Sequence, residues 1–403
     1  MSNIEAHIRA VLPDMAALRR DLHAHPELGF EEHRTSRRVA EILSNVPNLA
    51  IQTQVARTGV VALLNAGRPG PCVMLRADMD ALPITEETHL EYASTTPGRM
   101  HACGHDGHTS CLVGAALVLS RIADDLPGKV KFVFQPAEEN DGGGRFMVDA
   151  GVLENPRVDA AFALHAWPTR PVGTISLRPG PAMAAVDTVV ITVKGRGSHG
   201  AYPHRGIDPI LTASHVVVAL QSIVARFIDP IDCGVVTVGS IHGGSVPNVI
   251  PPECTMELTL RSHQRETRMR LRELVRQIAE NTARSFGALA DVQLKEGYPC
   301  TVNDPALSEW LAAVGRDVLG PENAQTTDPP SMGAEDFAFY AERVPAVMFR
   351  LGVCPTDRQS CPSLHNPQFD FNDDALPVGI RMLCEVAMRF LRERPTASSS
   401  PQR

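Results

Sequence analysis

The sequence of 403 residues lacks several features that would assign it to a protein class directly. Its net charge is -8 at pH 7, so it has no basic excess with which to neutralise nucleic-acid phosphates. No window of eighteen residues is both uncharged and apolar throughout, which predicts no membrane-spanning segment. The charged N-terminal stretch has no apolar run of the kind found in a secretory signal. We therefore expect a cytoplasmic protein that binds neither nucleic acid nor membrane.

Cysteine is present, but not in the spacing of a disulfide framework. The nine cysteines are scattered along the chain and their number is odd, so we expect free thiols in a reducing compartment. Serine, histidine and aspartate all occur, but no GxSxG motif does, which argues against a serine hydrolase. At 403 residues, the chain is long enough for two domains.

Short apolar runs alternate with helical stretches in the two outer parts of the chain. This alternation predicts an α/β domain with a largely parallel sheet covered by helices. We expect strands at 60–65, 72–78, 129–135, 159–165 and 345–352, and helices at 4–22, 33–45 and 110–122.

The middle of the chain, residues 187–298, has a different pattern. Strand-like and helical stretches follow one another there in the order β-α-β-β-α-β, which is typical of a ferredoxin-like domain. Strands of the first kind resume after it. The sequence thus predicts an inserted domain at 187–298 and a discontinuous α/β domain formed by residues 1–186 and 299–403.

Residues 100–110, MHACGHDGHTS, place His101, His105 and His108 close to one cysteine and one aspartate. A single histidine is more often a core or loop residue than a ligand. Several within so few positions, interleaved with glycine, predict a metal site.

Further candidate ligands follow predicted strands, and in open α/β sheets ligands collect beyond the carboxyl ends of the strands. Taken singly, Cys103 could be an inert buried thiol and His365 a surface loop residue. Together the candidates exceed the needs of one tetrahedral ion, which predicts two ions. The five candidate metal ligands are Cys103, His105, Glu139, His165 and His365.

The segment PAEE brings two carboxylates together directly after the strand at 129–135. Consecutive side chains of an extended segment point in different directions. We assign Glu139 to metal binding and Glu138 to proton transfer, because a carboxylate beside a metal-activated water can pass a proton to a leaving amine. The residues thus predict metal-assisted hydrolysis.

Several long motifs now resemble one family. They include DLHAHPELGFEE, LRADMDALPI, MHACGHDGHTSCLVGAA, FQPAEENDGGGRFM, GRGSHGAYPHRGIDP, GGSVPNVIPPE and LHNPQFDF. From about residue 15 to residue 390, the chain is similar to the dinuclear metallo-amidohydrolases that include hippurate hydrolases, aminoacylases and plant auxin-conjugate hydrolases.

The resemblance implies the same five metal ligands and Glu138 as the general base. It also implies that His199 stabilises the oxyanion from the partner subunit, that Asn248 and Arg261 bind substrate, and that Asp80 supports the metal ligands. Arg261 would hold the substrate carboxylate. In more distant peptidase relatives a histidine stands where this chain has Asp78, so their ligand set does not carry over.

The resemblance further implies that the inserted domain is a lid and mediates dimerisation, in a homodimer or a tetramer built from dimers. Two divalent ions per chain are expected, and zinc, manganese, nickel and cobalt all suit such a ligand set. The implied substrates are N-acyl or N-aroyl amino acids, cleaved at the amide bond.

Two other functions stay open at this point. A dipeptidase or carboxypeptidase, or an N-carbamoyl amino acid hydrolase, would use the same site. An inactive binding protein for acylated small molecules is a third hypothesis, which the joint presence of Glu138 and all five candidate ligands disfavours.

Overall fold

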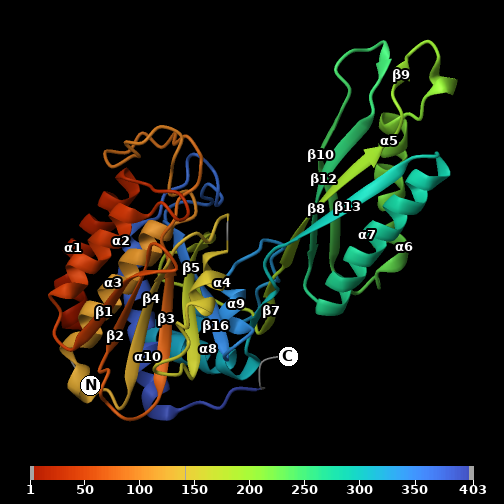
Figure 1. The fold of residues 1–403 in the computed structure, drawn as a ribbon. Coiled ribbons are helices and arrows are strands. Elements are labelled where there is room, and N and C mark those ends of the chain that lie inside the picture. Colours follow the sequence, from red (N-terminus) through yellow and green to blue (C-terminus); the bar gives the residue numbers. More distant parts are fainter. Residues whose placement is uncertain (1–3, 141, 399–403) are drawn as a thin grey trace. The chain divides into compact units, whose positions relative to one another are not determined.

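The structure, a computed structural model, describes residues 4–140 and 142–398, which form two compact units (Figure 1). The first unit comprises Met1–Gly180, Val302–Pro329 and Asp336–Arg403, and the second comprises Pro181–Thr301 and Pro330–Glu335. Each unit has its own cluster of buried hydrophobic side chains.

The first unit is built on an eight-stranded sheet with the strand order β1-β2-β4-β3-β5-β16-β6-β15. Its central strands β4, β3, β5 and β16 run parallel to one another, whereas β1 and β2 at one edge are antiparallel to their neighbours. The predicted α/β fold with a largely parallel sheet is thereby confirmed. The strands are β1 (Leu49–Val55), β2 (Gly59–Leu64), β3 (Cys72–Asp78), β4 (Lys129–Gln135), β5 (Ala160–Pro171), β6 (Ile175–Ser176), β15 (Ala324–Gln325) and β16 (Ala346–Cys354).

Helices cover this sheet in layers. Helices α3 and α10 pack on β3 and β5, and α1 packs in turn on α3 and α10. Helix α3 is buried along most of its length, which agrees with its apolar sequence SCLVGAALVL. The helices of this unit are α1 (Ile4–Ala24), α2 (His33–Ser44), α3 (His105–Arg121), α4 (Gly143–Asp149), α8 (Pro305–Leu319), α9 (Ala338–Ala341) and α10 (Leu376–Glu393).

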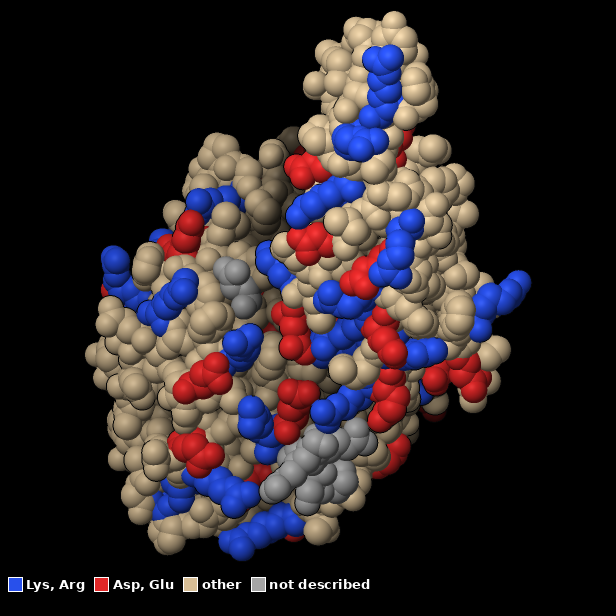
Figure 2. Space-filling model, turned by 45° about the vertical axis from the view of Figure 1, so that its right-hand side comes forward, with Lys and Arg blue, Asp and Glu red and all other residues tan. Residues whose placement is uncertain are grey.

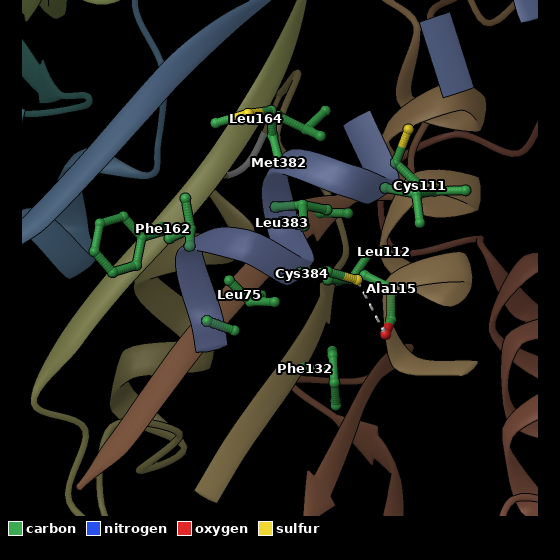
Figure 3. Close-up of a cluster of buried hydrophobic side chains, with 14 of the residues drawn as sticks. Leu75, Cys111, Leu112, Ala115, Phe132, Phe162, Leu164, Met382, Leu383 and Cys384 are labelled. Carbon is green, nitrogen blue, oxygen red and sulfur yellow. Dashed lines mark hydrogen bonds between the residues drawn. The ribbon is translucent and has the colours of Figure 1, made fainter. Parts of the chain in front are cut away.

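The core of the first unit lies between α3, α10 and the sheet (Figure 3). Leu112 from α3 and Leu383 from α10 are fully buried together with Phe132 and Phe162 from the strands. The thiol of Cys384 lies 3.8 Å from the carbonyl oxygen of Ala115, the contact drawn as a dashed line. Close packing of this kind holds both helices against the strands that carry the polar residues described below.

The second unit contains a four-stranded antiparallel sheet with the order β10-β12-β8-β13. Side chains of β8 alternate between buried and half-buried, as expected for a strand with one face against helices. Its strands are β8 (Ala185–Lys194), β10 (Gly234–Gly243), β12 (Glu253–Ser262) and β13 (Leu289–Glu296), and its helices are α5 (Pro209–Leu220), α6 (Ser222–Phe227) and α7 (Arg265–Ser285). The role of this unit as a lid stays a prediction.

One stretch, Pro209–Phe227, is long and apolar enough to cross a membrane by length and composition alone. This does not test the prediction that no segment spans a membrane. In the structure these residues form the two helices α5 and α6, which pack beside α7.

On the face shown in Figure 2, basic and acidic side chains are interspersed, with no continuous basic stripe.

The prediction that no cysteines pair is wrong at one place. Cys354 at the end of β16 and Cys361 form a disulfide, with their Cα atoms 5.8 Å apart. The chain turns back on itself after β16, which brings two cysteines seven residues apart within bonding range. The other seven cysteines, all within the described residues, are free.

Gly107, in the first turn of α3, lies against the buried ring of Phe371. A Cβ atom at Gly107 would come within 2.3 Å of that ring. We expect Gly107→Ala to lower the free energy of unfolding by about 1–3 kcal/mol, because a rigid buried ring must move to accommodate the methyl group. Gly67→Ala is the matched control, since nothing lies within 4 Å of its added Cβ. Urea unfolding that shows equal stability for the two variants would contradict this account of α3.

Candidate metal centre

Two groups of possible metal ligands share one thiol in the first unit. Cys103, His105 and His165 form one group, and Cys103, Glu139 and His365 form the other. Within each group the ligand atoms lie within 4.8 Å of one another. The structure thus brings together all five residues that the sequence singled out as candidate ligands.

The first group joins the start of α3 to the middle strand β5. Cys103 lies in the loop just before α3, and His105 is the first residue of that helix. The Sγ atom of Cys103 is 3.6 Å from Nε2 of His165. Gly104, between Cys103 and His105, has a φ of 89°, which L side chains rarely adopt, so glycine is favoured at this turn.

The second group includes the only ligand candidate that is well exposed. His365 has a side chain that is 52 % exposed, and its Nε2 atom lies 3.3 Å from Oε1 of Glu139. Its backbone N–H donates to the carbonyl oxygen of Ala102, 2.8 Å away. With a φ of 63°, His365 is held in the left-handed region, a strain that ordered surroundings must maintain.

Asp80, which follows β3, orients two of these residues. Its carboxylate accepts a hydrogen bond from the backbone N–H of Glu139 at 2.9 Å. Its carbonyl oxygen accepts one from Nδ1–H of His105 at 2.8 Å, which directs Nε2 of His105 toward the other ligands. These contacts are compatible with the predicted role of Asp80, which stays a prediction.

Burial and acidic neighbours set the protonation of the centre. Burial, together with the carboxylates of Glu139 and Glu138, raises the pKa of the Cys103 thiol well above its ordinary value. Burial alone would lower the pKa of His105, but the carboxylates of Asp78 and Asp80 outweigh it and raise that pKa to about 10. At His165 burial prevails and lowers the pKa to about 4.

The polar atoms of the centre fit a cation. Nε2 of His105 and Oε1 of Glu139 are buried, and neither has a partner in hydrogen-bond geometry among the described residues, although Oε1 lies near the imidazoles of His105 and His365. A buried polar atom without a partner is costly, and several acidic groups around one point repel each other. A divalent cation would satisfy both atoms and offset the repulsion, so the donor set suits a metal.

Glu138 lies beside the centre on the turn after β4. It is 5 % exposed, and its Oε1 atom accepts a hydrogen bond from the backbone N–H of Asp336 at 3.3 Å. Ala137 before it has a φ of 53°, an uncommon conformation for a residue with a side chain. The backbone N–H of Ala137 donates a hydrogen bond to the buried carboxylate of Glu32 at 2.8 Å, so a residue of the N-terminal segment stabilises the turn.

The remaining predicted site residues lie in the second unit. His199 in β9 (Ser198–His199) pairs with Val249 of β11 (Val249–Ile250). Asn248 directly precedes β11, and its carbonyl oxygen accepts a hydrogen bond from the backbone N–H of Gly200 at 2.7 Å. Arg261 lies near the end of β12, where its guanidinium donates to the carbonyl oxygen of Met332 at 3.0 Å. Burial lowers the pKa of Arg261 from its ordinary value.

A fully buried ion pair next to the candidate ligands was not predicted from the sequence. Arg76 in β3 donates to Asp78 at 2.7 Å and to Asp336 at 2.8 Å. The one signal in the sequence was an arginine within an otherwise apolar strand, because such a charge needs a partner.

Comparison with known proteins places this geometry in a family. The profile of peptidase family M20/M25/M40 matches residues 74–389. The chain belongs to this family. It is 41% identical over 383 residues to IAA-amino acid hydrolase ILR1-like 4 of Arabidopsis thaliana, covering 94% of this chain and 86% of the relative.

Two further relatives cover nearly the whole chain. N-acetylcysteine deacetylase of Bacillus subtilis is 38% identical over 378 residues, covering 93% of this chain and 96% of the relative. The crystal structure of the Bacillus subtilis YxeP protein, described as a dinuclear metal-binding peptidase of the M20 family, has a TM-score of 0.82. It is 34% identical and covers 95% of this chain and 99% of that one. The chain is therefore a hydrolase of amide bonds, and its ligand groups support two divalent metal ions.

Metal binding should be coupled to proton release. At pH 7 the raised pKa values keep Cys103 and His105 protonated without metal, whereas His165 is already neutral. Metal ligands must be deprotonated, so filling the centre with zinc should release about two protons per chain, and affinity should fall as the pH is lowered.

Titration calorimetry in two buffers of different ionisation enthalpy measures this number. Cys103→Ser should release fewer protons, since a serine hydroxyl does not ionise in this range. An affinity that is the same at pH 6 and pH 8 would contradict the assignment.

Proposed function

We propose that the chain is a metal-dependent amidohydrolase that cleaves N-acyl or N-aroyl amino acids to a carboxylic acid and a free amino acid. The observation that carries the proposal is the pair of ligand groups sharing Cys103, with Glu138 beside them. Similarity to an IAA-amino acid hydrolase and an N-acetylcysteine deacetylase supports this substrate class.

In this proposal Cys103, His105 and His165 hold one divalent ion, and Cys103, Glu139 and His365 hold the other. Bound ions would act as Lewis acids that polarise the scissile carbonyl and lower the pKa of a water molecule at the site. The mixed thiolate, imidazole and carboxylate set suits zinc, manganese, nickel or cobalt.

Glu138 is the proposed general base. Its carboxylate takes a proton from the attacking water and delivers it to the nitrogen of the leaving amine. Its Oε1 atom is oriented by the backbone N–H of Asp336, and burial of the side chain keeps bulk water from competing for the proton.

The second unit is proposed to complete the site as a lid and to mediate formation of a homodimer or of a tetramer of dimers. His199 would stabilise the oxyanion from the partner subunit, and Asn248 would bind substrate. A hydrogen bond from the N–H of Ala201 to Nδ1 of His199 leaves Nε2 as the atom available to donate.

A cytoplasmic location is part of the proposal, supported by the seven free cysteines.

A substrate panel tests the reaction class. With added zinc, manganese, nickel or cobalt, we expect turnover of N-acetyl and N-benzoyl amino acids to exceed that of a dipeptide and of an N-carbamoyl amino acid. Glu138→Gln should lower turnover by about 10² to 10⁴ while keeping its metal, because it removes only the proton acceptor. Glu139→Gln should instead lose metal.

The panel separates the alternatives. Preference for the dipeptide would make the chain a peptidase, and preference for the carbamoyl compound a carbamoylase. Binding of acyl amino acids without turnover under any metal would identify an inactive binding protein.

We propose that Arg261 holds the substrate carboxylate. A guanidinium can form two parallel hydrogen bonds to a carboxylate, which fixes orientation as well as charge. Such charge-assisted bonds are worth about 1.5–3 kcal/mol, so Arg261→Ala should lower kcat/KM by roughly ten- to a hundredfold. The loss should be much smaller on the matching amide of the substrate.

Arg270→Ala is the matched control, because Arg270 is an exposed arginine of the same unit paired with Glu273. Equal losses on the acid and its amide would show that Arg261 does not read the carboxylate.

A further inference from the structure

His108, one turn into α3, bridges a buried carboxylate and the backbone of β5. Its Nδ1 atom lies 2.6 Å from Oδ1 of Asp78, and its Nε2 atom lies 2.7 Å from the backbone nitrogen of Ala166. All the side chains involved are fully buried.

These contacts define which ring nitrogen of His108 carries the proton. The backbone N–H of Ala166 can only donate, so Nε2 of His108 must accept and carries no hydrogen. The hydrogen therefore lies on Nδ1, where it is donated to Asp78. Arg76 donates to the other oxygen of Asp78 at 2.7 Å and keeps that carboxylate in place as an acceptor.

The chain of contacts continues to a proposed metal ligand. The carbonyl oxygen of Ala166 lies 2.8 Å from Nδ1 of His165, so that nitrogen donates to it. Nε2 of His165 then carries a lone pair, and it lies 3.6 Å from Sγ of Cys103. Both backbone polar groups of Ala166 are thus occupied, one by His108 and one by His165.

We infer that His108 is a positioning residue, which acts through the backbone of Ala166 to hold His165 in the tautomer and orientation that bind metal through Nε2. This inference rests on the proposed metal centre. It gives Asp78 the task of anchoring His108. Partners of this kind typically change metal affinity by about 10- to 100-fold when removed.

A competing possibility is that His108 binds metal itself. Asp78, His105 and His108 also lie close enough together to hold an ion. Both ring nitrogens of His108 are already engaged, however, and a metal would have to displace either the Ala166 N–H or the Asp78 carboxylate. The hydrogen bonds favour the positioning role.

The first test reads the tautomer directly in metal-free wild-type protein labelled with ¹⁵N-histidine. Long-range ¹H–¹⁵N spectra should show His108 with hydrogen on Nδ1 and none on Nε2, its signals being identified by their loss in His108→Gln. Hydrogen on Nε2, alone or on both nitrogens, would overturn the inference. This outcome does not depend on whether the chain hydrolyses any amide, so it separates the inference from the proposed function.

The second test measures zinc affinity by competition with a chelator. His108→Leu removes both hydrogen bonds and should weaken binding of one of the two zinc ions by about 10- to 100-fold. His108→Gln keeps one donor and one acceptor at similar spacing and should recover part of that affinity. His101→Leu is the control, because His101 is as deeply buried but has no hydrogen-bond partner among the described residues.

The inference is overturned if His108→Leu binds zinc as tightly as the wild type, or if His108→Gln is no better than His108→Leu. Far-ultraviolet circular dichroism establishes that each variant is folded. Should His108→Leu fail to fold, two results decide: the tautomer of His108 in the wild type and the zinc affinity of His108→Gln. The expected tautomer, together with a zinc affinity between those of the wild type and His165→Leu, supports the positioning role. A zinc affinity of His108→Gln equal to that of His165→Leu refutes it.

Discussion

The candidate metal centre depends on one constraint: several carboxylates lie close together around the buried Cys103 and His105. Asp78, Asp80 and Glu139 lie within a few ångströms of His105, in a place that water barely reaches. Without compensation these carboxylates would repel each other. Arg76 neutralises part of the charge from behind, and the two ligand groups leave room for cations to neutralise the rest.

The packing of α3 fixes the positions of these side chains. The helix begins at His105, so its geometry decides where that side chain points, and α10 and Phe371 pack against the helix. The start of α3 is thus positioned by packing in the core as well as by hydrogen bonds of its own residues.

Much of this was readable in the sequence. Strands β3 and β4 are mostly apolar stretches, and their bounds coincide with the predicted ranges 72–78 and 129–135. The candidate ligands, which the structure brings together, could be singled out because cysteine, histidine and glutamate gather near strand ends. Strand β1 was missed because its side chains are mostly half-buried or exposed, which weakens the apolar signal. The pairing of Arg76 with Asp336 was out of reach, since 260 residues separate them and only the folded sheet brings them together.

The two proposed ion sites differ in their access to solvent, and this has a kinetic consequence. Every ligand of the Cys103, His105 and His165 group is buried, whereas His365 in the other group is half exposed. A ligand open to water can dissociate and let solvent replace it, whereas a buried one must wait for the surrounding structure to open. The ion held by His365 would then exchange with the medium faster, so that a one-ion form retaining the inner ion would be the first product of metal starvation.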